Sequence, residues 1–391
     1  MTPPTALIAG AGIGGLAAAL ALERAGWNVR VFERAASPRE LGFALNLAAN
    51  AMAALDELGI AEPVLNGGHR TGVAEIRRPD GRALKRVYLP EAIGQAVAIV
   101  ATRPVLHGAL LAAVEHTCPG ALELGAEAVD FEQDGSGVVL RLADGRDVRG
   151  DMLVGADGVG SAVRRRLHPH EGPPRSSGHH ALRGVAHGVV ELLGDVSAAT
   201  YLGDGIEASI ARAGRDAVYW YMSLLTADVG ATAETPHELA RRFVRRLDRT
   251  FTAIVEATQR GDVRLDQLFD REPLAQWGTG LVTLLGDAAH PMLPHTGQGA
   301  AQALEDAVAL GLAVRQVEGL PAALRRYERI RSARTRALVV RGRRAAWITT
   351  THNPVLKAVR TGLIRLVPAR VMARMFMLVE RTDPHRELRA L

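Results

Sequence analysis

The feature that most constrains the fold is a glycine-rich segment near the start of the chain, residues 5–33, TALIAGAGIGGLAAALALERAGWNVRVFE. It predicts a buried strand, an alanine-rich helix and a second strand, in that order. Between the first strand and the helix, Gly10, Gly12 and Gly15 follow the G-x-G-x-x-G spacing. In a βαβ unit the first glycine permits the turn, the second lets the backbone approach a pyrophosphate, and the third lets the helix pack closely. Glycine-rich turns also serve packing alone, but the flanking strands and helix together indicate a dinucleotide site.

An acid at the end of the second strand narrows the choice of nucleotide. Glu33 follows the glycines by roughly twenty residues, where a carboxylate accepts hydrogen bonds from a ribose diol. The same charge repels a 2′-phosphate, so the resident nucleotide should be FAD or NAD and not NADP. The chain contains one such fingerprint, so a second dinucleotide would have no domain of its own and should bind transiently.

Two further stretches place an acid after an apolar strand. In residues 151–167, DMLVGADGVGSAVRRRL, a short strand stops before Asp157 and Ser161 is suited to cap a helix. Alone, Asp157 could be an ordinary Asp-Gly turn. In residues 284–307, LLGDAAHPMLPHTGQGAAQALEDA, Asp287 ends the strand and a glycine-opened helix follows. Ligands of open α/β sheets collect beyond the carboxyl ends of strands, and a helix amino end favours an anion there. We therefore expect Asp287 to bind hydroxyls of a cofactor chain.

Composition excludes several classes of protein. The length of 391 residues suggests two domains, and 48% hydrophobic with 23% charged residues is typical of soluble globular chains. The single cysteine, Cys118, rules out an intrachain disulfide and a cysteine-based zinc cluster, and we predict no metal site. A net charge of +5 without basic–aromatic blocks argues against nucleic-acid binding. Glycines interrupt the uncharged amino-terminal run, so we expect neither a signal peptide nor a membrane helix, and a cytoplasmic location.

The three motifs in this order, GAGIGG…FER, GADGVGSAVR and GDAAHPMLPHTGQGAAQALEDA, resemble the group A flavoprotein monooxygenases, single-component FAD hydroxylases of the p-hydroxybenzoate hydroxylase fold. The resemblance runs from about residue 5 to residue 344. It implies an α/β fold with a Rossmann-like FAD-binding domain, an inserted sheet-based substrate domain and a C-terminal helical tail. The implied boundaries are 1–70, 97–172 and 275–345 for the FAD-binding domain, 71–96 and 173–274 for the substrate domain, and 346–391 for the helical region.

The resemblance also implies which residues hold FAD, from its pyrophosphate and adenosine to its flavin ring. The pyrophosphate would lie on Gly10, Gly12, Ile13, Gly14 and Gly15. The adenosine end would be held by Glu33, Arg34 and, at the adenine, Val129. Arg103 would reach FAD from the second crossover helix, and Asp157 would serve both FAD and a visiting NADH or NADPH. Asp287 would bind the ribityl-phosphate part, and the isoalloxazine would be lined by Pro294, Gly297, Gly299 and Ala300.

The family reaction implies that NADH or NADPH reduces FAD, that O2 forms a flavin C4a-hydroperoxide, and that one oxygen atom enters an aromatic substrate. Several alternatives stay open, namely a flavin epoxidase, halogenase or reductase of the same superfamily, or a non-catalytic flavin-binding protein. The Trp-x-Trp-x-Ile-Pro signature of the halogenases does not occur in the sequence.

Two departures from the family pattern concern the flavin loop and the substrate. Ala49 stands where the family commonly has proline, and the strand-like stretch GIEASIARAGRDAVYWYMSL offers tyrosines where related enzymes carry a His–Tyr pair. The candidate catalytic residues are Arg183, Tyr221 and His295. Plainer roles are a solvated charge for Arg183 and loop packing for His295. The region between residues 182 and 225 is rich in small apolar residues, which favours a bulky hydrophobic aromatic or polyketide-like substrate over a small benzoate.

Local patterns outside the motifs predict the remaining elements. They are a hairpin turning at 79–81, a meander over 131–150, a crossing linker over 171–178, strands over 182–190 and 217–225 that form a sheet over the flavin, one amphipathic helix over 237–258, and a helical tail over 346–391. The tail should pack against the FAD-binding domain, with a membrane-surface role as the alternative.

Overall fold

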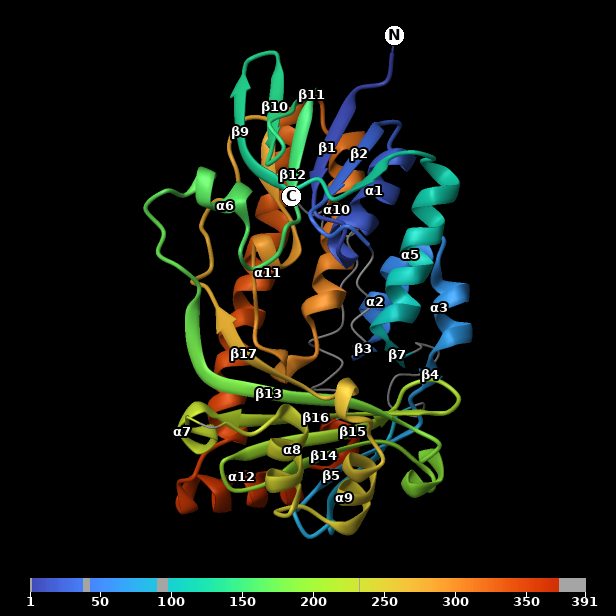
Figure 1. The fold of residues 1–391 in the computed structure, drawn as a ribbon, viewed down its shortest axis with the longest axis vertical. Helices are drawn as coiled ribbons and strands as arrows, with labels where there is room; N and C mark the ends of the chain where they lie inside the picture. Colours follow the sequence, from blue (N-terminus) through green and yellow to red (C-terminus); the bar gives the residue numbers. More distant parts are fainter. Residues whose placement is uncertain (1, 38–42, 90–97, 232, 373–391) are drawn as a thin grey trace.

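The computed structural model describes residues 2–37, 43–89, 98–231 and 233–372. Figure 1 shows an elongated molecule with two lobes, an upper one built on a parallel sheet and a lower one built on a larger sheet. The long helix α11 (Leu320–Thr349) runs from the upper lobe into the lower one. Two hydrophobic cores correspond to these lobes, one around the parallel sheet and one behind the larger sheet.

The upper lobe confirms the predicted Rossmann-like unit. Its five strands pair in parallel, in the order β18 (Val282–Leu284), β12 (Met152–Gly155), β1 (Thr5–Ala9), β2 (Asn28–Glu33) and β8 (Leu122–Leu124). The helices beside this sheet are α1 (Ile13–Arg24), α5 (Arg103–Thr117) and α10 (Gly299–Gln316). Small residues let α1 and α10 touch, because a Cβ at Gly311 would lie 2.7 Å from the carbonyl oxygen of Ala21.

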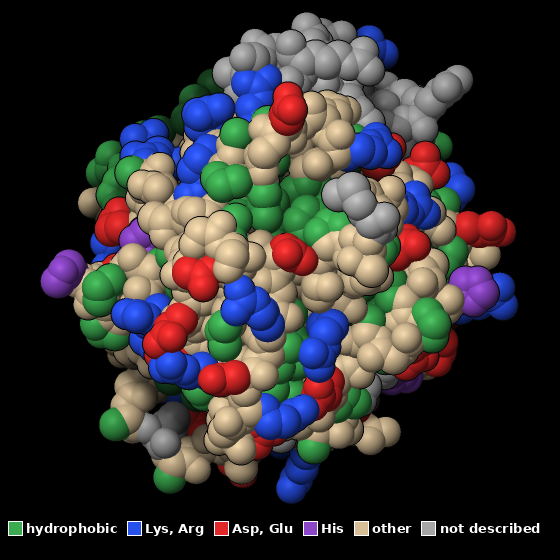
Figure 2. All heavy atoms as spheres, turned by 90° about the horizontal axis from the view of Figure 1, so that it is seen from above, with side chains coloured by type: hydrophobic (Ala, Val, Ile, Leu, Met, Phe, Trp, Pro, Cys, Tyr) green, Lys and Arg blue, Asp and Glu red, His purple; other side chains and the backbone are tan. Residues whose placement is uncertain are grey.

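Smaller elements complete this lobe. The predicted meander is present as β9 (Ala128–Asp134), β10 (Gly137–Leu142) and β11 (Asp147–Gly150). A second small sheet contains β3 (Ala44–Leu47), β7 (Ile99–Thr102) and β4 (His69–Arg70), and the short helices are α2 (Ala49–Glu57), α3 (Ala61–Gly67) and α6 (Ala162–Leu167). Figure 2 looks onto this end of the molecule and shows basic and acidic side chains interspersed. In the β9–β11 meander, Arg141 forms an ion pair with Glu132 and Arg146 forms one with Asp144.

The lower lobe is a seven-stranded sheet covered by helices on its outer face. Its order is β17 (Arg264–Asp270), β13 (Arg175–His187), β16 (Ala217–Leu225), β15 (Ile206–Arg212), β14 (Val196–Leu202), β5 (Val73–Arg77) and β6 (Ala83–Tyr88). The predicted hairpin is β5–β6, and the two strands expected in one sheet are the antiparallel pair β13–β16. Trp220 and Phe251 pack edge to face behind the sheet. The outer helices and turns are α7 (Thr226–Val229), α8 (Pro236–Val244), α9 (Arg249–Glu256), η1 (Val190–Leu193) and η2 (Arg260–Asp262).

Three sequence predictions were wrong in detail. The single helix expected over 237–258 is two helices, because Asp248 leaves the helix and accepts a hydrogen bond from the Phe251 amide at 2.8 Å, which starts α9. The linker expected over 171–178 is partly strand, since β13 already pairs with β17 at Arg175. The boundary at 345–346 falls inside α11, which continues unbroken to Thr349.

The carboxyl-terminal part of the described chain is helix α12 (Pro354–Leu366), which contacts β6 of the lower lobe. The expected tail packing against the FAD-binding domain is therefore wrong for α12. The rest of the predicted tail, 373–391, lies outside the described residues, as does the end of the predicted segment 71–96 from residue 90 onward. Among the residues the structure describes, no helix is both long and apolar enough to cross a membrane.

Candidate active site

A cavity of about 400 Å³ lies between the two lobes and brings the sequence motifs together. Its upper wall comes from the glycine turn, the turn after β18 and the start of α10. Its lower wall is the inner face of the large sheet, and Phe43 to Asn46 close one side. Of the predicted cofactor residues, the lining contains Gly12, Ile13, Gly14, Arg103, Asp287, Pro294, Gly297, Gly299 and Ala300.

The glycine turn has the shape that a pyrophosphate requires. Gly10 has a φ of +99°, and a Cβ at Gly15 would lie 1.9 Å from the carbonyl oxygen of Gly10, so both positions are fixed by packing. A Cβ at Gly12 would meet no atom within 4 Å, so this glycine borders open space. Among the described residues, no side chain caps the amino end of α1 and no acid lies in its first turn. Free N–H groups and a helix dipole therefore face the site expected for the phosphates.

The predicted adenosine residues do not line the cavity, and one of them, Glu33, contacts the glycine turn. The Glu33 carboxylate accepts hydrogen bonds from the amides of Ala11 and Ala35, both at 2.9 Å, and so joins the glycine turn to the end of β2. Each carboxylate oxygen can accept a further bond. Arg34 is exposed, and Val129 is an exposed apolar residue on β9. Their contacts with adenosine stay predictions.

Asp157 combines a structural contact with a free oxygen. Its Oδ2 accepts the Ala162 amide at 2.7 Å, while Ser161 caps the same helix by accepting the Arg164 amide. Its Oδ1 is buried without a partner among the described residues, and burial raises the pKa of this carboxyl. Asp157 is not in the cavity lining, although Ala156 and Gly158 are. The contacts of Asp157 show its role in the turn, and its role in nucleotide binding stays a prediction.

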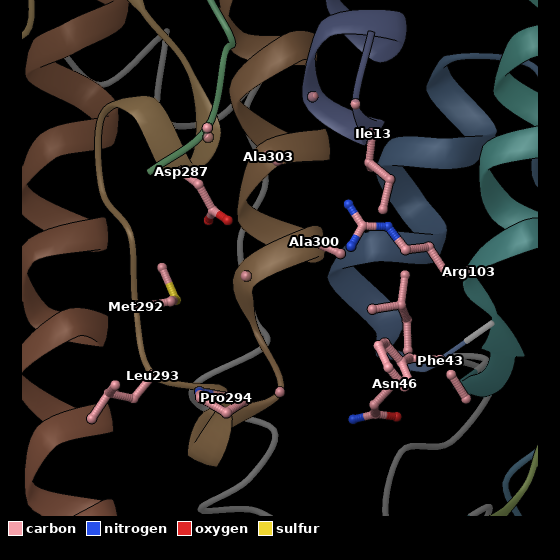
Figure 3. A pocket seen from close by; sticks show the side chains of 18 of the residues that line it. Ile13, Phe43, Asn46, Arg103, Asp287, Met292, Leu293, Pro294, Ala300 and Ala303 are labelled. Carbon is pink, nitrogen blue, oxygen red and sulfur yellow. The ribbon is translucent and has the colours of Figure 1, made fainter. Parts of the chain in front are cut away.

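Asp287 projects into the cavity from η3 (Gly286–Ala288), a short helical turn that follows β18. Figure 3 shows Asp287 and Arg103 pointing toward the middle of the cavity from opposite sides. Although the Asp287 side chain is exposed toward the open cavity, the surrounding protein desolvates its carboxyl and raises the pKa, and the neighbouring His290 and Arg103 oppose that rise. A carboxylate placed this way can accept hydrogen bonds from the hydroxyls of a cofactor chain.

A buried polar network beneath the turn holds Asp287 in place. Asp306 on α10 accepts the Gly286 amide at 3.0 Å and pairs with His290 at 2.6 Å. Arg331 on α11 donates to Asp306 and to Glu305, each at 2.6 Å. The sequence analysis assigned no role to Glu305 and Asp306. Their position on a helix that is otherwise mostly apolar was the available signal, because buried acids require cationic or hydrogen-bonding partners.

Arg164 is a second residue that the sequence analysis missed. Its side chain is fully buried, forms an ion pair with Glu171 at 2.6 Å, and donates to the carbonyl oxygens of Ala288 and Ala289 at 2.9 Å. It therefore ties the second motif to the third. Within the Arg164–Arg166 run the sequence alone does not separate this buried arginine from its two less buried neighbours.

The start of α10 presents backbone to the cavity. Gly297 ends the turn η4 (Pro294–Thr296) in the left-handed region, with a φ of +63°. No side-chain hydrogen bond from Gln298, which precedes α10, caps this helix in the described structure. Gly299 and Ala300 then line the cavity with little side-chain bulk. A flat ring can approach this surface, and the amino end of α10 favours negative charge on it.

The inner face of the large sheet supplies the remaining wall. Tyr219 and Tyr221 on β16 line the cavity while Trp220 faces the core behind, as their alternation predicts. Arg183 on β13 pairs in register with Tyr221, and its guanidinium lies 5.4 Å from the Phe43 ring centre and 4.0 Å from an Asp266 oxygen. The Tyr221 hydroxyl is buried without a partner among the described residues. Burial raises the pKa of Tyr221, so this phenol is a neutral polar group.

His295 does not line the cavity. Its Nε2 lies 2.9 Å from the Ser223 hydroxyl, and its ring packs edge to face against His179, with 5.6 Å between ring centres. Burial and the neighbouring His179 lower the pKa of His295 to about 3. These contacts agree with loop packing. The imidazole also lies edge to face against Tyr221 of the cavity wall, with 6.4 Å between ring centres, and a role in proton transfer stays a prediction.

Glu207 on β15 is a cavity residue that sequence reasoning overlooked. It is 8% exposed, and its Oε2 has no hydrogen-bond partner among the described residues. Burial raises the pKa of this carboxyl to about 7. An acid inside the apolar strand IEASI was the signal, because an unpaired charge is rare on a buried strand.

Comparisons with known proteins agree with this site. The sequence model of the FAD binding domain family matches residues 4–342. Aurachin C monooxygenase/isomerase of Stigmatella aurantiaca is 35% identical over 374 residues, covering 95% of this chain and 96% of the relative. 3-Hydroxybenzoate 6-hydroxylase 1 of Aquipseudomonas alcaligenes is 36% identical over 344 residues, covering 84% and 85%. The crystal structure of Klebsiella pneumoniae HpxO complexed with FAD and uric acid superposes with a TM-score of 0.89 at 25% identity, covering 96% of each chain.

The family match spans most of the chain, and the relatives cover nearly all of it. The glycine turn, Asp287 and the start of α10, which belong to the first and third sequence motifs, line one cavity. The chain therefore belongs to the FAD binding domain family and is an FAD-dependent monooxygenase of the group A type.

Proposed function

We propose that this enzyme is reduced by NADH or NADPH and inserts one oxygen atom of O2 into a hydrophobic aromatic or polyketide-like substrate. The observation that carries the proposal is the shared cavity, in which the predicted flavin-binding backbone faces the tyrosines of the large sheet. The names of the relatives, which include a hydroxybenzoate hydroxylase and aurachin C monooxygenase/isomerase, support an aromatic substrate.

Bound FAD would supply the electron transfer and the oxygen activation. The residues of the chain would bind and orient it, with the Gly12 to Gly14 backbone at the pyrophosphate and Asp287 at the ribityl hydroxyls. Phe43, Met292 and Leu293 give the cavity apolar walls, which would limit water access during the reaction. Tyr219 and Tyr221 would position an aromatic ring by stacking and by one polar contact.

The sheet side of the cavity favours a substrate without a carboxylate. Arg183 is the cation that this sheet contributes to the described lining, and it already contacts Asp266 and the Phe43 ring. Glu207 lies on the same face and would repel a second negative charge. Shape and stacking would therefore select the substrate more than ion pairing does.

The experiment is a panel of polycyclic phenols and simple hydroxybenzoates, assayed for NADH and NADPH oxidation, hydrogen peroxide release and product mass. Coupled hydroxylation of polycyclic phenols, with product matching reductant consumed, is the expected result. Efficient coupled hydroxylation of 3-hydroxybenzoate with all polycyclic phenols inert would overturn the substrate class. NADH and NADPH oxidation that no aromatic compound stimulates would overturn the monooxygenase reaction itself.

A further inference from the structure

The inner face of the large sheet is an ordered grid of side chains. In the strand order β13, β16, β15, one row contains Arg183, Tyr221 and Ser209, and the next row contains Ser223 and Glu207. Alternation along β15 sends Glu207 and Ser209 to the cavity and the intervening Ala208 to the core behind. The cation and the acid thus lie on opposite sides of Tyr221.

Glu207 differs from the other buried acids of the protein. Glu305 contacts Arg331 and Gln302, and Glu75 on β5 contacts Arg77 and Arg86, so both are satisfied by partners. Glu207 has a buried oxygen without a hydrogen bond and no ion-pair partner among the described residues. An acid with only a structural role would destabilise the fold here, because a buried polar atom without a partner loses its hydrogen bonds to water and gains none in the protein.

The groups that face Glu207 are few. Tyr221 approaches from β16, Thr349 of α11 stabilises the carboxylate through a side-chain hydrogen bond, and Arg360 of α12 stabilises it through its charge. Arg360 donates its own hydrogen bonds to the carbonyl oxygens of Ile348 and Thr349, at 3.0 and 2.7 Å. Arg360 therefore stabilises charge on Glu207 without a hydrogen bond to its free oxygen, and Glu207 is one of the residues that line the cavity.

We infer that Glu207 binds an acidic O–H or N–H group of a neutral aromatic substrate and accepts its proton during oxygenation. This inference rests on the proposed monooxygenase function. The substrate O–H or N–H bond breaks, the proton moves to the free Glu207 oxygen, and the electron pair stays on the heteroatom. That pair enriches the ring in electrons, and oxygenation requires an electron-rich ring. The substrate class is thus a phenol or an N–H heteroaromatic without a carboxylate of its own.

The pKa of Glu207 suits such a role. Burial raises it to about 7, so a substantial fraction is ionised near neutral pH and can act as a base. The raised pKa of Glu207 also predicts an effect of pH on the stability of the fold. Above pH 7 the ionised carboxyl opposes folding, so Glu207→Gln should raise the urea midpoint there. Below about pH 4 the group is protonated in both the folded and the unfolded state, and the variant should match wild type.

Binding of 2-naphthol and of its methyl ether tests the contact on the FAD-loaded enzyme, read from the change in flavin absorbance. We expect at least tenfold tighter binding of 2-naphthol by wild type and loss of that preference in Glu207→Ala. Glu75→Gln, a buried acid of the same sheet that does not line the cavity, should keep it. The inference would be overturned if wild type bound the two compounds equally or bound neither of them. It would also be overturned if Glu207→Ala retained the preference for 2-naphthol.

Turnover tests the proton transfer. Glu207→Gln keeps the shape of the side chain and should lower kcat for 2-naphthol roughly 100-fold at pH 7, with recovery as the pH approaches about 10, where phenols ionise unaided. A kcat equal to wild type, or a loss that does not recover with pH, would contradict the role as a base. Failure of the proposed function would look different, because reductant would then be consumed without hydroxylated product while the binding preference remained.

Discussion

Replacing Asp306 by asparagine should destabilise the enzyme and loosen the turn that carries Asp287. Asp306 serves three donors, the Gly286 amide, His290 and Arg331. The ion partners lower its pKa from 3.8 to about 2, although burial alone would raise it. One pKa unit corresponds to about 1.36 kcal/mol, so the charge of Asp306 stabilises the fold by about 2 kcal/mol. Asparagine also turns an N–H2 group toward donors, and we expect a total loss of about 2–4 kcal/mol.

The measurement is urea unfolding at a fixed FAD concentration, because bound cofactor adds its own stabilisation. Asp147→Asn, which changes an exposed acid on β11, should stay within about 0.5 kcal/mol of wild type. Since the folded pKa of Asp306 is lowered, its contribution is complete above about pH 4 and disappears as pH falls toward 2. The difference between wild type and variant should therefore be constant from pH 8 to 5 and shrink below pH 4. A variant as stable as wild type at pH 7 would refute the role assigned to this network.

Three further predictions concern the cofactor. Asp287→Ala should weaken FAD binding by about 1–3 kcal/mol, and a variant that purifies with full flavin and unchanged affinity would contradict the ribityl assignment. Glu33→Arg should lower FAD affinity without creating an NADP site, so tight NADP binding in a titration would show that the wrong dinucleotide was chosen. Gly15→Ala should lower the thermal midpoint of the apoprotein, since its Cβ meets the Gly10 carbonyl, whereas Gly12→Ala should leave that midpoint unchanged and reduce FAD affinity. Equal effects of the two glycine variants on apoprotein stability would disprove this division of roles.

The parts that could be predicted from sequence are those where one local pattern fixes both backbone and ligand. Strand β1 is the buried strand expected before the glycine turn, because a buried parallel strand is a continuous apolar run and the glycines fix its end. The alternation of Tyr219, Trp220 and Tyr221 likewise determined which side chains face the cavity.

The parts that could not be predicted depend on long-range contacts. Partners far away in the sequence determine the roles of Arg164, Glu207 and Arg331. No local sequence pattern identifies those partners. The break between α8 and α9 was missed because both halves share one amphipathic pattern, and only the cap at Asp248 separates them. The contacts of His295 with Ser223 and His179 likewise join residues far apart in the sequence.

The continuity of α11 has a consequence for how ligands enter and leave. Near its start Tyr327 donates to the Leu284 carbonyl of the parallel sheet at 3.0 Å, and further along Arg343 pairs with Asp270 of the large sheet at 2.6 Å. Just beyond its end Thr350 lies 3.0 Å from His179 on β13. A single helix bonded to both sheets opposes a hinge between them, so opening should be confined to residues 43–46 and 292–294, which border the cavity. In hydrogen exchange, the amides of α11 should be as slow as those of the sheets, and the amides of these two segments should exchange first.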